Sequence, residues 1–348
     1  MAAINISKAD SSSSLPWVHA AVCAPVLTYV QHLGVPLNRH LEKHLLPLHG
    51  WSDPDTLIAR HAFGRFMAGI SRSQGIENIG WESMMHGQTS RASFEYWAPH
   101  KPTLYSELKA SIERTRKHAT IEFSLIENRD SVLVHRMPPD NARNYDVELG
   151  WGGLAIFIGL VRAFAGKEWR PTRIAMPSLA FAGDSVLAEF SDTKFVPTDR
   201  DWWFEIPRRY LSLAPSQFSE SGGRNARNTP SGDSSVASQG CGATLGKVIV
   251  PYLPSGAPTL ERAAEIFGTS PRTLKRRLAR ANCTYSGVLE ETRFAVAKDL
   301  LQGTDLKIMD IAREAGYSGA SNFTRAFRRT AGMTPHQFRR LRSRLGRK

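Results

Sequence analysis

Basic, hydroxyl and amide side chains recur at helical spacing in two short segments near the end of the chain. Such side chains bind phosphate oxygens and base edges, because arginine and lysine carry hydrogen-bond donors and asparagine carries both a donor and an acceptor. In the first segment the candidate DNA-binding residues are Ser270, Arg272, Thr273, Lys275, Arg276 and Arg280. In the second segment they are Ser318, Ser321, Asn322, Thr324, Arg325, Arg328 and Arg329. The sequence does not separate the side chains that would read bases from those that would contact only phosphates.

The second segment has the pattern of two short helices joined by a glycine turn. Residues 309–315 predict the first helix, Gly316 the turn, and residues 320–330 the second helix. The second helix has arginines on one side, while Phe323 and Phe327 lie on the other and predict a buried face. This is the helix-turn-helix design, whose second helix fits the major groove of DNA.

The same pattern occurs earlier in the chain, where Gly268 corresponds to Gly316, 48 positions on. Ser270 followed by proline is a strong signal for the start of the second helix of this copy. Leu274 and Leu278, four residues apart, predict its buried face. The chain therefore contains two helix-turn-helix patterns.

Residues 285–301 lie between the two copies and predict one more helix with an apolar stripe. A helix of about 16 residues is roughly 24 Å long. That length suits two recognition helices in successive major grooves, roughly 34 Å apart on one face of DNA. One polypeptide would then contact two adjacent groove segments without dimerising.

Residues 243–345 resemble the DNA-binding domain of AraC/XylS-type transcription regulators. In the second half the resemblance is carried by Ile308, Asp310, Ile311, Ala312, Gly316, Tyr317, Ser318, Ser321, Phe323, Arg325, Phe327, Arg328, Gly332, Thr334, Pro335, Phe338 and Arg339. In the first half it is carried by Ala264, Ser270, Pro271, Leu274, Arg276, Leu278, Arg293 and Leu301. Two correctly spaced patterns followed by Gly-Met-Thr-Pro are far more specific than one. Asn282 stands where the family has glycine, and asparagine also tolerates the left-handed conformation of such a turn.

This resemblance implies double-stranded promoter DNA and RNA polymerase as partners, and activation of transcription as the outcome. Repression remains open. The family also implies an amino-terminal domain that binds a small-molecule effector, dimerises, or does both.

Charge and aromatic residues are distributed unequally along the 348 residues. Residues 251–348 contain 19 Lys or Arg and 8 Asp or Glu, so they carry +11 of the formal net charge of +13. All 8 tryptophans lie before residue 204. A basic end is the usual footprint of a nucleic-acid-binding domain, whereas the nearly neutral remainder indicates a different role.

These observations predict a multidomain protein. We expect an α+β effector or dimerisation domain over residues 1–213, a Ser/Gly-rich flexible linker over 214–242, and an all-α double helix-turn-helix domain over 243–345. In the first domain we predict helices at 26–33, 37–46, 56–69, 103–118 and 145–164, a hairpin at 120–136, and strands at 172–176 and 185–190. Its element order, with Trp169-Arg-Pro and Phe204-Glu-Ile-Pro-Arg, resembles the arabinose-binding-like effector domain of regulators of amino-acid catabolism and mycobacterial virulence.

Several other classes of protein are disfavoured. The sequence contains no GxSxG, HExxH, phosphate-binding loop or dinucleotide fingerprint, so we expect no enzyme. Cys23, Cys241 and Cys283 are far apart and lack metal-ligand spacing, which predicts reduced thiols, no metal site and no cofactor. Neither a signal peptide nor a membrane span is expected, which favours a cytoplasmic location.

The sequence therefore predicts a bacterial, sequence-specific DNA-binding transcription regulator, an activator that responds to a small-molecule effector. Aromatic residues in the first domain would suit an apolar or aromatic effector, although each of them more often fills a core. The alternatives are an effector-independent architectural DNA-binding protein and a repressor.

Overall fold

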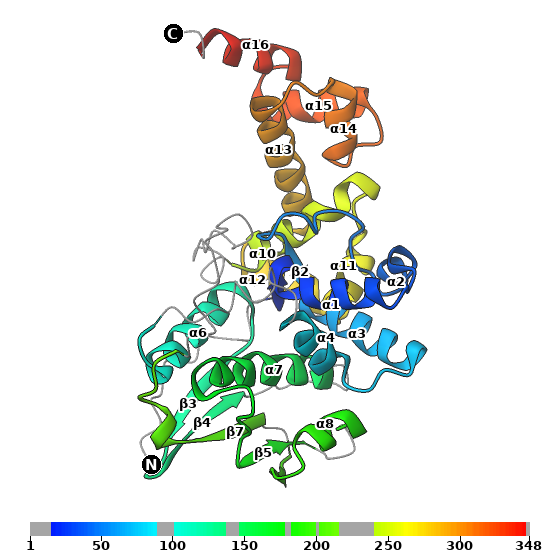
Figure 1. Cartoon of the computed structure of the whole chain (residues 1–348). Helices are drawn as coiled ribbons and strands as arrows, with labels where there is room; N and C mark the ends of the chain where they lie inside the picture. Colours follow the sequence, from blue (N-terminus) through cyan, green and yellow to red (C-terminus); the bar gives the residue numbers. More distant parts are fainter. Residues whose placement is uncertain are drawn as a thin grey trace. The chain divides into compact units, whose positions relative to one another are not determined.

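The computed structural model describes residues 15–88, 101–136, 146–177, 182–199, 202–215 and 240–345. These residues form two compact units (Figure 1). The first consists mainly of the described residues up to 215, and the second mainly of residues 240–345. Most of the predicted linker, 214–242, lies outside the described residues.

A five-stranded sheet forms one layer of the first unit, with strand order β3-β4-β7-β5-β6. The strands are β3 (Phe123–Glu127), β4 (Ser131–Arg136), β7 (Trp202–Pro207), β5 (Arg173–Met176) and β6 (Lys194–Pro197). All neighbours are antiparallel except β5 and β6, which are parallel and joined through α8 (Asp184–Glu189). Trp202, Phe204 and Ile206 alternate with less buried residues along β7, as expected for a strand with one face in a core.

Helices α6 and α7 pack on this sheet, and helices α1 to α4 lie beyond α7, which is the longest of them (Figure 1). The helices are α1 (Ala20–His32), α2 (Leu37–Lys43), α3 (Arg60–Gln74), α4 (Ile79–Gln88), α6 (Leu104–His118) and α7 (Asp146–Ala165). Two short strands, β1 (Trp17–His19) and β2 (Leu57–Ala59), pair antiparallel before α1 and α3. By length and composition α7 is able to cross a membrane, but 72% of its apolar window is buried in the protein, as in a core helix.

The structure confirms the mixed α and β class of this unit and corrects several of its elements. The helices predicted at 37–46, 103–118 and 145–164 and the hairpin at 120–136 are present as α2, α6, α7 and β3–β4. The strand predicted at 185–190 is wrong: this segment is α8, because Val186 and Phe190 are spaced four residues apart and are both buried. Residues 57–59 are a strand instead of the start of α3, and α1 begins before Pro25.

Residues 240–345 of the second unit form helices joined by turns and short loops. Its elements are α10 (Cys241–Ile249), the 3-10 helix η5 (Val250–Ser255), α11 (Leu260–Ile266), α12 (Pro271–Arg280), α13 (Tyr285–Gly303), α14 (Ile308–Glu314), α15 (Ala320–Ala331) and α16 (Pro335–Leu345). The five helices predicted from the two patterns are confirmed as α11 to α15. Helix α13 packs on α10 near its start and on α14 and α16 near its end. It therefore connects the two helix-turn-helix pairs within one unit (Figure 1).

Candidate DNA-binding surface

The first helix-turn-helix pair consists of α11 and α12. Gly268 has φ +64° in the turn between them, a backbone conformation that glycine adopts at little cost. The Ser270 side chain caps α12 by accepting a hydrogen bond of 3.1 Å from the backbone N–H of Thr273. Leu274 and Leu278 are buried, so the opposite face of α12 points to solvent. After α12, Asn282 has φ +54°, as predicted for this position.

The second pair consists of α14 and α15 and has an aromatic core. Phe323 and Phe327 are fully buried on the inner face of α15, with ring centroids 5.7 Å apart. Phe327 also contacts Phe294 of α13 and Phe338 of α16, with centroid distances of 5.1 and 5.5 Å. Tyr317 packs on Phe323 at 5.3 Å. These contacts anchor α15 on one side and leave its polar side exposed.

Gly316 forms the turn of the second pair under two constraints, one on its backbone and one on the space around it. Its φ is +76°, and a Cβ atom placed on it would lie 3.1 Å from Leu253 Cδ2 and 3.2 Å from the Leu253 carbonyl oxygen. Segment η5 therefore packs directly on this turn. Since a side chain is disfavoured by both the backbone conformation and the space, glycine is required here.

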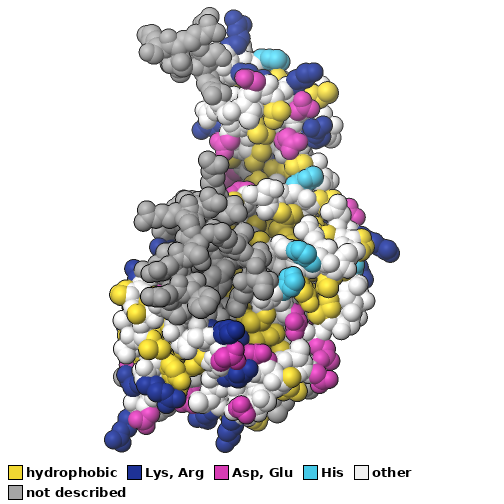
Figure 2. All heavy atoms as spheres, in the orientation of Figure 1, with side chains coloured by type: hydrophobic (Ala, Val, Ile, Leu, Met, Phe, Trp, Pro, Cys, Tyr) yellow, Lys and Arg dark blue, Asp and Glu magenta, His cyan; other side chains and the backbone are white. Residues whose placement is uncertain are grey.

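The predicted DNA-binding residues lie on the outer sides of the two second helices. Most of their side chains are exposed: Ser270, Arg272, Lys275, Arg276, Arg280, Ser318, Ser321, Asn322, Arg325, Arg328 and Arg329. Thr273 and Thr324 are half-buried. On the face of the second unit visible in Figure 2, Lys and Arg side chains lie among acidic ones, and no broad patch of one sign appears.

The two second helices align with a shift of 49 residues instead of 48. The first helices keep the shift of 48, since α11 begins at Leu260 and α14 at Ile308. The buried pairs Leu274/Leu278 and Phe323/Phe327, however, are 49 positions apart. The turn of the second pair is thus one residue longer. With this shift Arg276 of α12 occupies the position of Arg325 of α15.

Three exposed side chains on the second pair form a hydrogen-bonded chain. Arg325 Nη2 donates to Asn322 Oδ1 at 2.6 Å, and Asn322 Nδ2 donates to Ser318 Oγ at 2.9 Å. Because a guanidinium has only donors, Asn322 must turn its oxygen toward Arg325, which leaves its NH2 group for Ser318. Both ends of the Asn322 amide are therefore occupied by protein partners, and the Arg325 guanidinium is held on the outer face of α15.

Other candidate residues have local partners as well. Arg329 forms an ion pair of 3.0 Å with Glu290 of α13. Asp310 forms an ion pair of 3.5 Å with Arg313. Arg293, noted in the sequence only for the resemblance, lies over the Tyr317 ring at 5.2 Å and joins α13 to the second turn. No local pattern in the sequence indicates this contact, because the two residues are distant in the chain.

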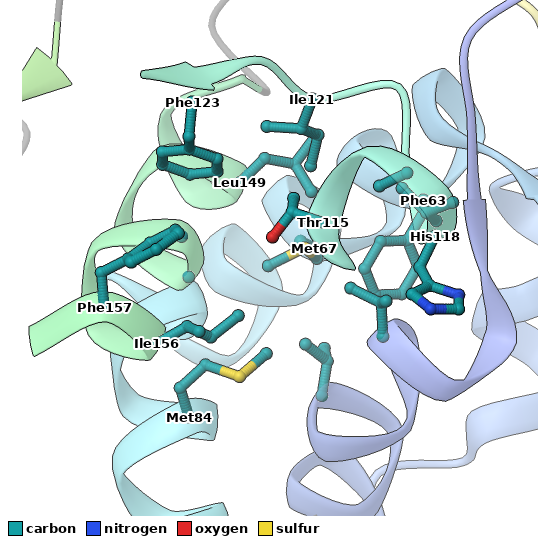
Figure 3. A pocket seen from close by; sticks show the side chains of 16 residues that line it. Phe63, Met67, Met84, Thr115, His118, Ile121, Phe123, Leu149, Ile156 and Phe157 are labelled. Atoms are coloured by element: carbon teal, nitrogen blue, oxygen red, sulfur yellow. The ribbon is translucent and has the colours of Figure 1, made fainter. Parts of the chain in front are cut away.

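A separate feature of the first unit is an apolar cavity of about 50 Å³ among β1, α1, α3, α4, α6, β3 and α7. Figure 3 shows Met67, Met84 and Ile156 around its open centre. It is lined by Val18, Val22, Val26, Phe63, Met67, Met84, Thr115, His118, Ala119, Ile121, Phe123, Leu149, Gly152, Gly153, Ile156 and Phe157. Three phenylalanines but no tryptophan are in this set, in line with the expectation that each aromatic residue more often fills a core. Trp81, Trp151 and Trp202 instead pack edge-to-face within the core.

Residues 263–341 match the helix-turn-helix domain family. The ornithine utilization regulator of Pseudomonas aeruginosa is 40% identical over 86 residues, which are 25% of this chain and 25% of that protein. The regulator VirS of Mycobacterium tuberculosis is 39% identical over 87 residues, 25% and 26% of the two chains. The matched segment thus spans about a quarter of the length of these relatives.

Among solved structures, the transcriptional regulator CdpR of Pseudomonas aeruginosa aligns over 88% of this chain and 96% of its own, with 20% identity and a TM-score of 0.34. The match over residues 263–341 coincides with the two helix-turn-helix pairs and the helix that connects them. The second unit of this chain therefore belongs to the AraC-type helix-turn-helix domains.

Proposed function

We propose that this protein is a sequence-specific transcription regulator that binds double-stranded promoter DNA in the bacterial cytoplasm. The observation that carries the proposal is the repeated geometry of the second unit. Two helix-turn-helix pairs each bury an apolar pair of side chains and expose an arginine at the same position, Arg276 in α12 and Arg325 in α15. One such helix is a common surface feature, whereas two in one domain match the arrangement used to read DNA.

The connecting helix supports recognition of two groove segments by one chain. Helix α13 has 19 residues. At 1.5 Å per residue it is about 28 Å long, which is comparable to the roughly 34 Å between successive turns of the major groove. We infer that α12 and α15 enter adjacent major-groove segments, so that one molecule covers a site of about two helical turns.

The candidate residues fall into three groups according to the protein side chains that they already contact. Ser270 and Thr273 are already joined to each other at the cap of α12, and Arg329 is paired with Glu290, so we assign them to the support of the helices or to phosphates. Arg276 and Arg325 are the candidates for base contacts, because a bidentate arginine recognises guanine. For the remaining exposed residues, base edges and phosphates are both open: Arg272, Lys275, Arg280, Ser318, Ser321, Asn322, Thr324 and Arg328.

Regulation would come from the first unit. The relatives' names describe transcriptional regulators, one of them of ornithine utilization. By analogy we propose that the first unit responds to a small-molecule effector or forms a homodimer, and that the DNA-bound protein contacts RNA polymerase and activates transcription. An effector acts only if it has different affinities for the two states of the protein. This role requires no catalytic group.

Selection of bound duplexes from a random DNA pool by the full chain tests the proposal. A single enriched motif of about two helical turns is expected, with a preference over scrambled DNA of about a thousandfold or more. Enrichment should be weakened by Arg325→Ala and preserved by Arg313→Ala, an exposed arginine on α14 outside the proposed surface. Equal affinity for all sequences would instead support an architectural protein. Transcription in vitro from a promoter bearing the motif would distinguish activation from repression.

A further inference from the structure

The cavity of the first unit has a consistent chemical character. Of its 16 lining residues, only Thr115 and His118 carry polar side-chain atoms. Three phenylalanines and two methionines supply its larger surfaces, and no lysine, arginine, aspartate or glutamate is among the residues that line it. A ligand in this cavity would therefore meet hydrocarbon, aromatic and thioether surface on nearly every side.

The two polar side chains do not change this character. Thr115 lies near the centre in Figure 3, but its hydroxyl donates to the carbonyl oxygen of Ser111, one turn earlier in α6, at 2.9 Å. Burial, followed by the nearby His19, lowers the pKa of His118 to about 4. His118 is therefore a neutral imidazole near pH 7. The cavity offers no charged group with which a carboxylate or an ammonium group could pair.

The volume of the cavity limits the size of the molecule that it holds. Two flexible methionine side chains allow this volume to change. At about 50 Å³ it is smaller than the cavity of about 150 Å³ that holds benzene in an engineered protein. Met67 and Met84 both line the cavity of the first unit (Figure 3). Methionine has three rotatable bonds and adapts to irregular apolar partners. Met84 and Ile156 are only half-buried, and rotation of these two side chains would enlarge the cavity to take one ring.

We propose that this cavity is a binding site for a small, uncharged and predominantly apolar molecule, about the size of a single aromatic ring, lodged between α7 and the helices α3, α4 and α6. That this molecule acts as the effector rests on the regulatory function proposed above, whereas its binding does not. The site excludes ornithine and other charged amino acids, because each buried charge would lose its hydration without gaining a partner. The relative in Pseudomonas aeruginosa is named for ornithine utilization, and ornithine belongs to the class of molecules that this cavity excludes.

Toluene and benzoate provide a matched pair of probes, since a carboxylate replaces the methyl group on the same ring. We would measure saturation-transfer NMR and the thermal midpoint of the full-length protein with each probe, and with ornithine. Toluene is expected to give saturation transfer and to raise the midpoint, while benzoate and ornithine give neither. Comparable binding of benzoate, or no toluene signal up to its solubility limit, would overturn the proposal.

Two variants locate the site. Ile156→Phe adds volume inside the cavity and is expected to weaken toluene binding by about tenfold or more, since packed interiors resist overfilling. Ile126→Phe makes the same change at a half-buried position of β3 that does not line the cavity, and should leave toluene binding unchanged. Equal binding by the wild type and Ile156→Phe would place the ligand elsewhere and refute the assignment.

DNA selection with the same protein preparation separates this inference from the proposed function. A protein that selects a DNA motif but does not bind toluene keeps the regulatory assignment and loses the cavity assignment. A protein that binds toluene but selects no motif keeps the cavity and loses the regulator. If both hold, toluene should change the affinity for the selected site in the wild type and have no effect on it in Ile156→Phe.

Discussion

The hydrogen-bonded chain on α15 predicts that Asn322 acts on DNA through Arg325. Asn322 already binds Arg325 through Oδ1 at 2.6 Å and Ser318 through Nδ2 at 2.9 Å, so both polar atoms of its amide are engaged within the protein. Its contribution is to hold the guanidinium in one orientation. Removal of the amide should therefore matter only while the guanidinium is present.

A double-mutant cycle measures this dependence. Arg325→Ala should cost about 1–3 kcal/mol of binding free energy if the arginine contacts guanine, or roughly 5- to 150-fold in affinity. Asn322→Ala should cost about 1 kcal/mol, the usual net value of one hydrogen bond, because the pair is exposed to water. In the Arg325→Ala background the same Asn322→Ala change should cost nearly nothing. The coupling energy is then about 1 kcal/mol, well above the 0.3–0.5 kcal/mol expected for independent sites.

Fluorescence anisotropy on a labelled duplex carrying the selected motif, at one fixed salt concentration, is the appropriate assay. Arg276→Ala with Asn322→Ala is the control cycle, since these residues belong to different helix-turn-helix pairs and should be additive. Asn322 is exposed and alanine favours helix, so the variant should fold. If Asn322→Ala costs 1 kcal/mol or more in both backgrounds, Asn322 contacts DNA directly and the positioning role is refuted.

Three further predictions concern stability. Gly316→Ala should destabilise the second unit by at least about 1–2 kcal/mol, from its left-handed backbone alone, whereas Gly303→Ala, which meets no described atom within 4 Å, should have little effect in urea unfolding followed by circular dichroism. Ser270→Ala should remove the cap of α12 and cost about 0.5–2 kcal/mol in the same assay; an unchanged midpoint would show that the cap is dispensable. Burial above all lowers the pKa of both His44 and His118 from 6.5 to about 4, so the unfolded chain binds more protons between these values and the first unit should lose stability as pH falls from 6.5 to 4. Tryptophan fluorescence reports mainly this unit, because most of the described tryptophans lie in it: Trp17, Trp81, Trp151, Trp169, Trp202 and Trp203. A flat profile would contradict the burial of these imidazoles.

The second unit was largely predictable from the sequence because its signals are local. Gly268, Ser270, Gly316 and the left-handed Asn282 each mark a turn or a helix end by residue type, and the apolar pairs mark the buried faces. The fold of the first unit was less predictable, because it depends more on contacts between residues that are distant in the chain. Residues 185–190 contain β-branched and aromatic side chains, yet burial of Val186 and Phe190 on one side makes them a helix. Strand β7 pairs with both β4 and β5, and no local pattern identifies those neighbours.

The candidate DNA-binding residues show the same difference between local signals, which the sequence contains, and contacts between distant residues, which it does not. Sequence spacing placed Asn322, Arg325 and Arg329 together on one exposed helix, which the structure confirms. It did not show that Arg329 meets Glu290 of α13 or that Asn322 and Arg325 bind each other. Side-chain hydrogen bonds depend on rotamers and on neighbouring helices, so residue types alone supplied the candidates without their division into separate roles.

The one-residue difference between the two turns has a consequence for exchanging recognition helices. A transplant that copies residues at a constant shift of 48 would place Leu274 at the position of Asn322. The leucine would then lie on the exposed face of the helix, and the aromatic core would lack the apolar side chain that anchors the helix. A shift of 49 puts leucine on phenylalanine and Arg276 on Arg325. An exchange of α12 and α15 therefore keeps the buried and exposed faces in place only when the helices are aligned at a shift of 49 and each turn is left unchanged.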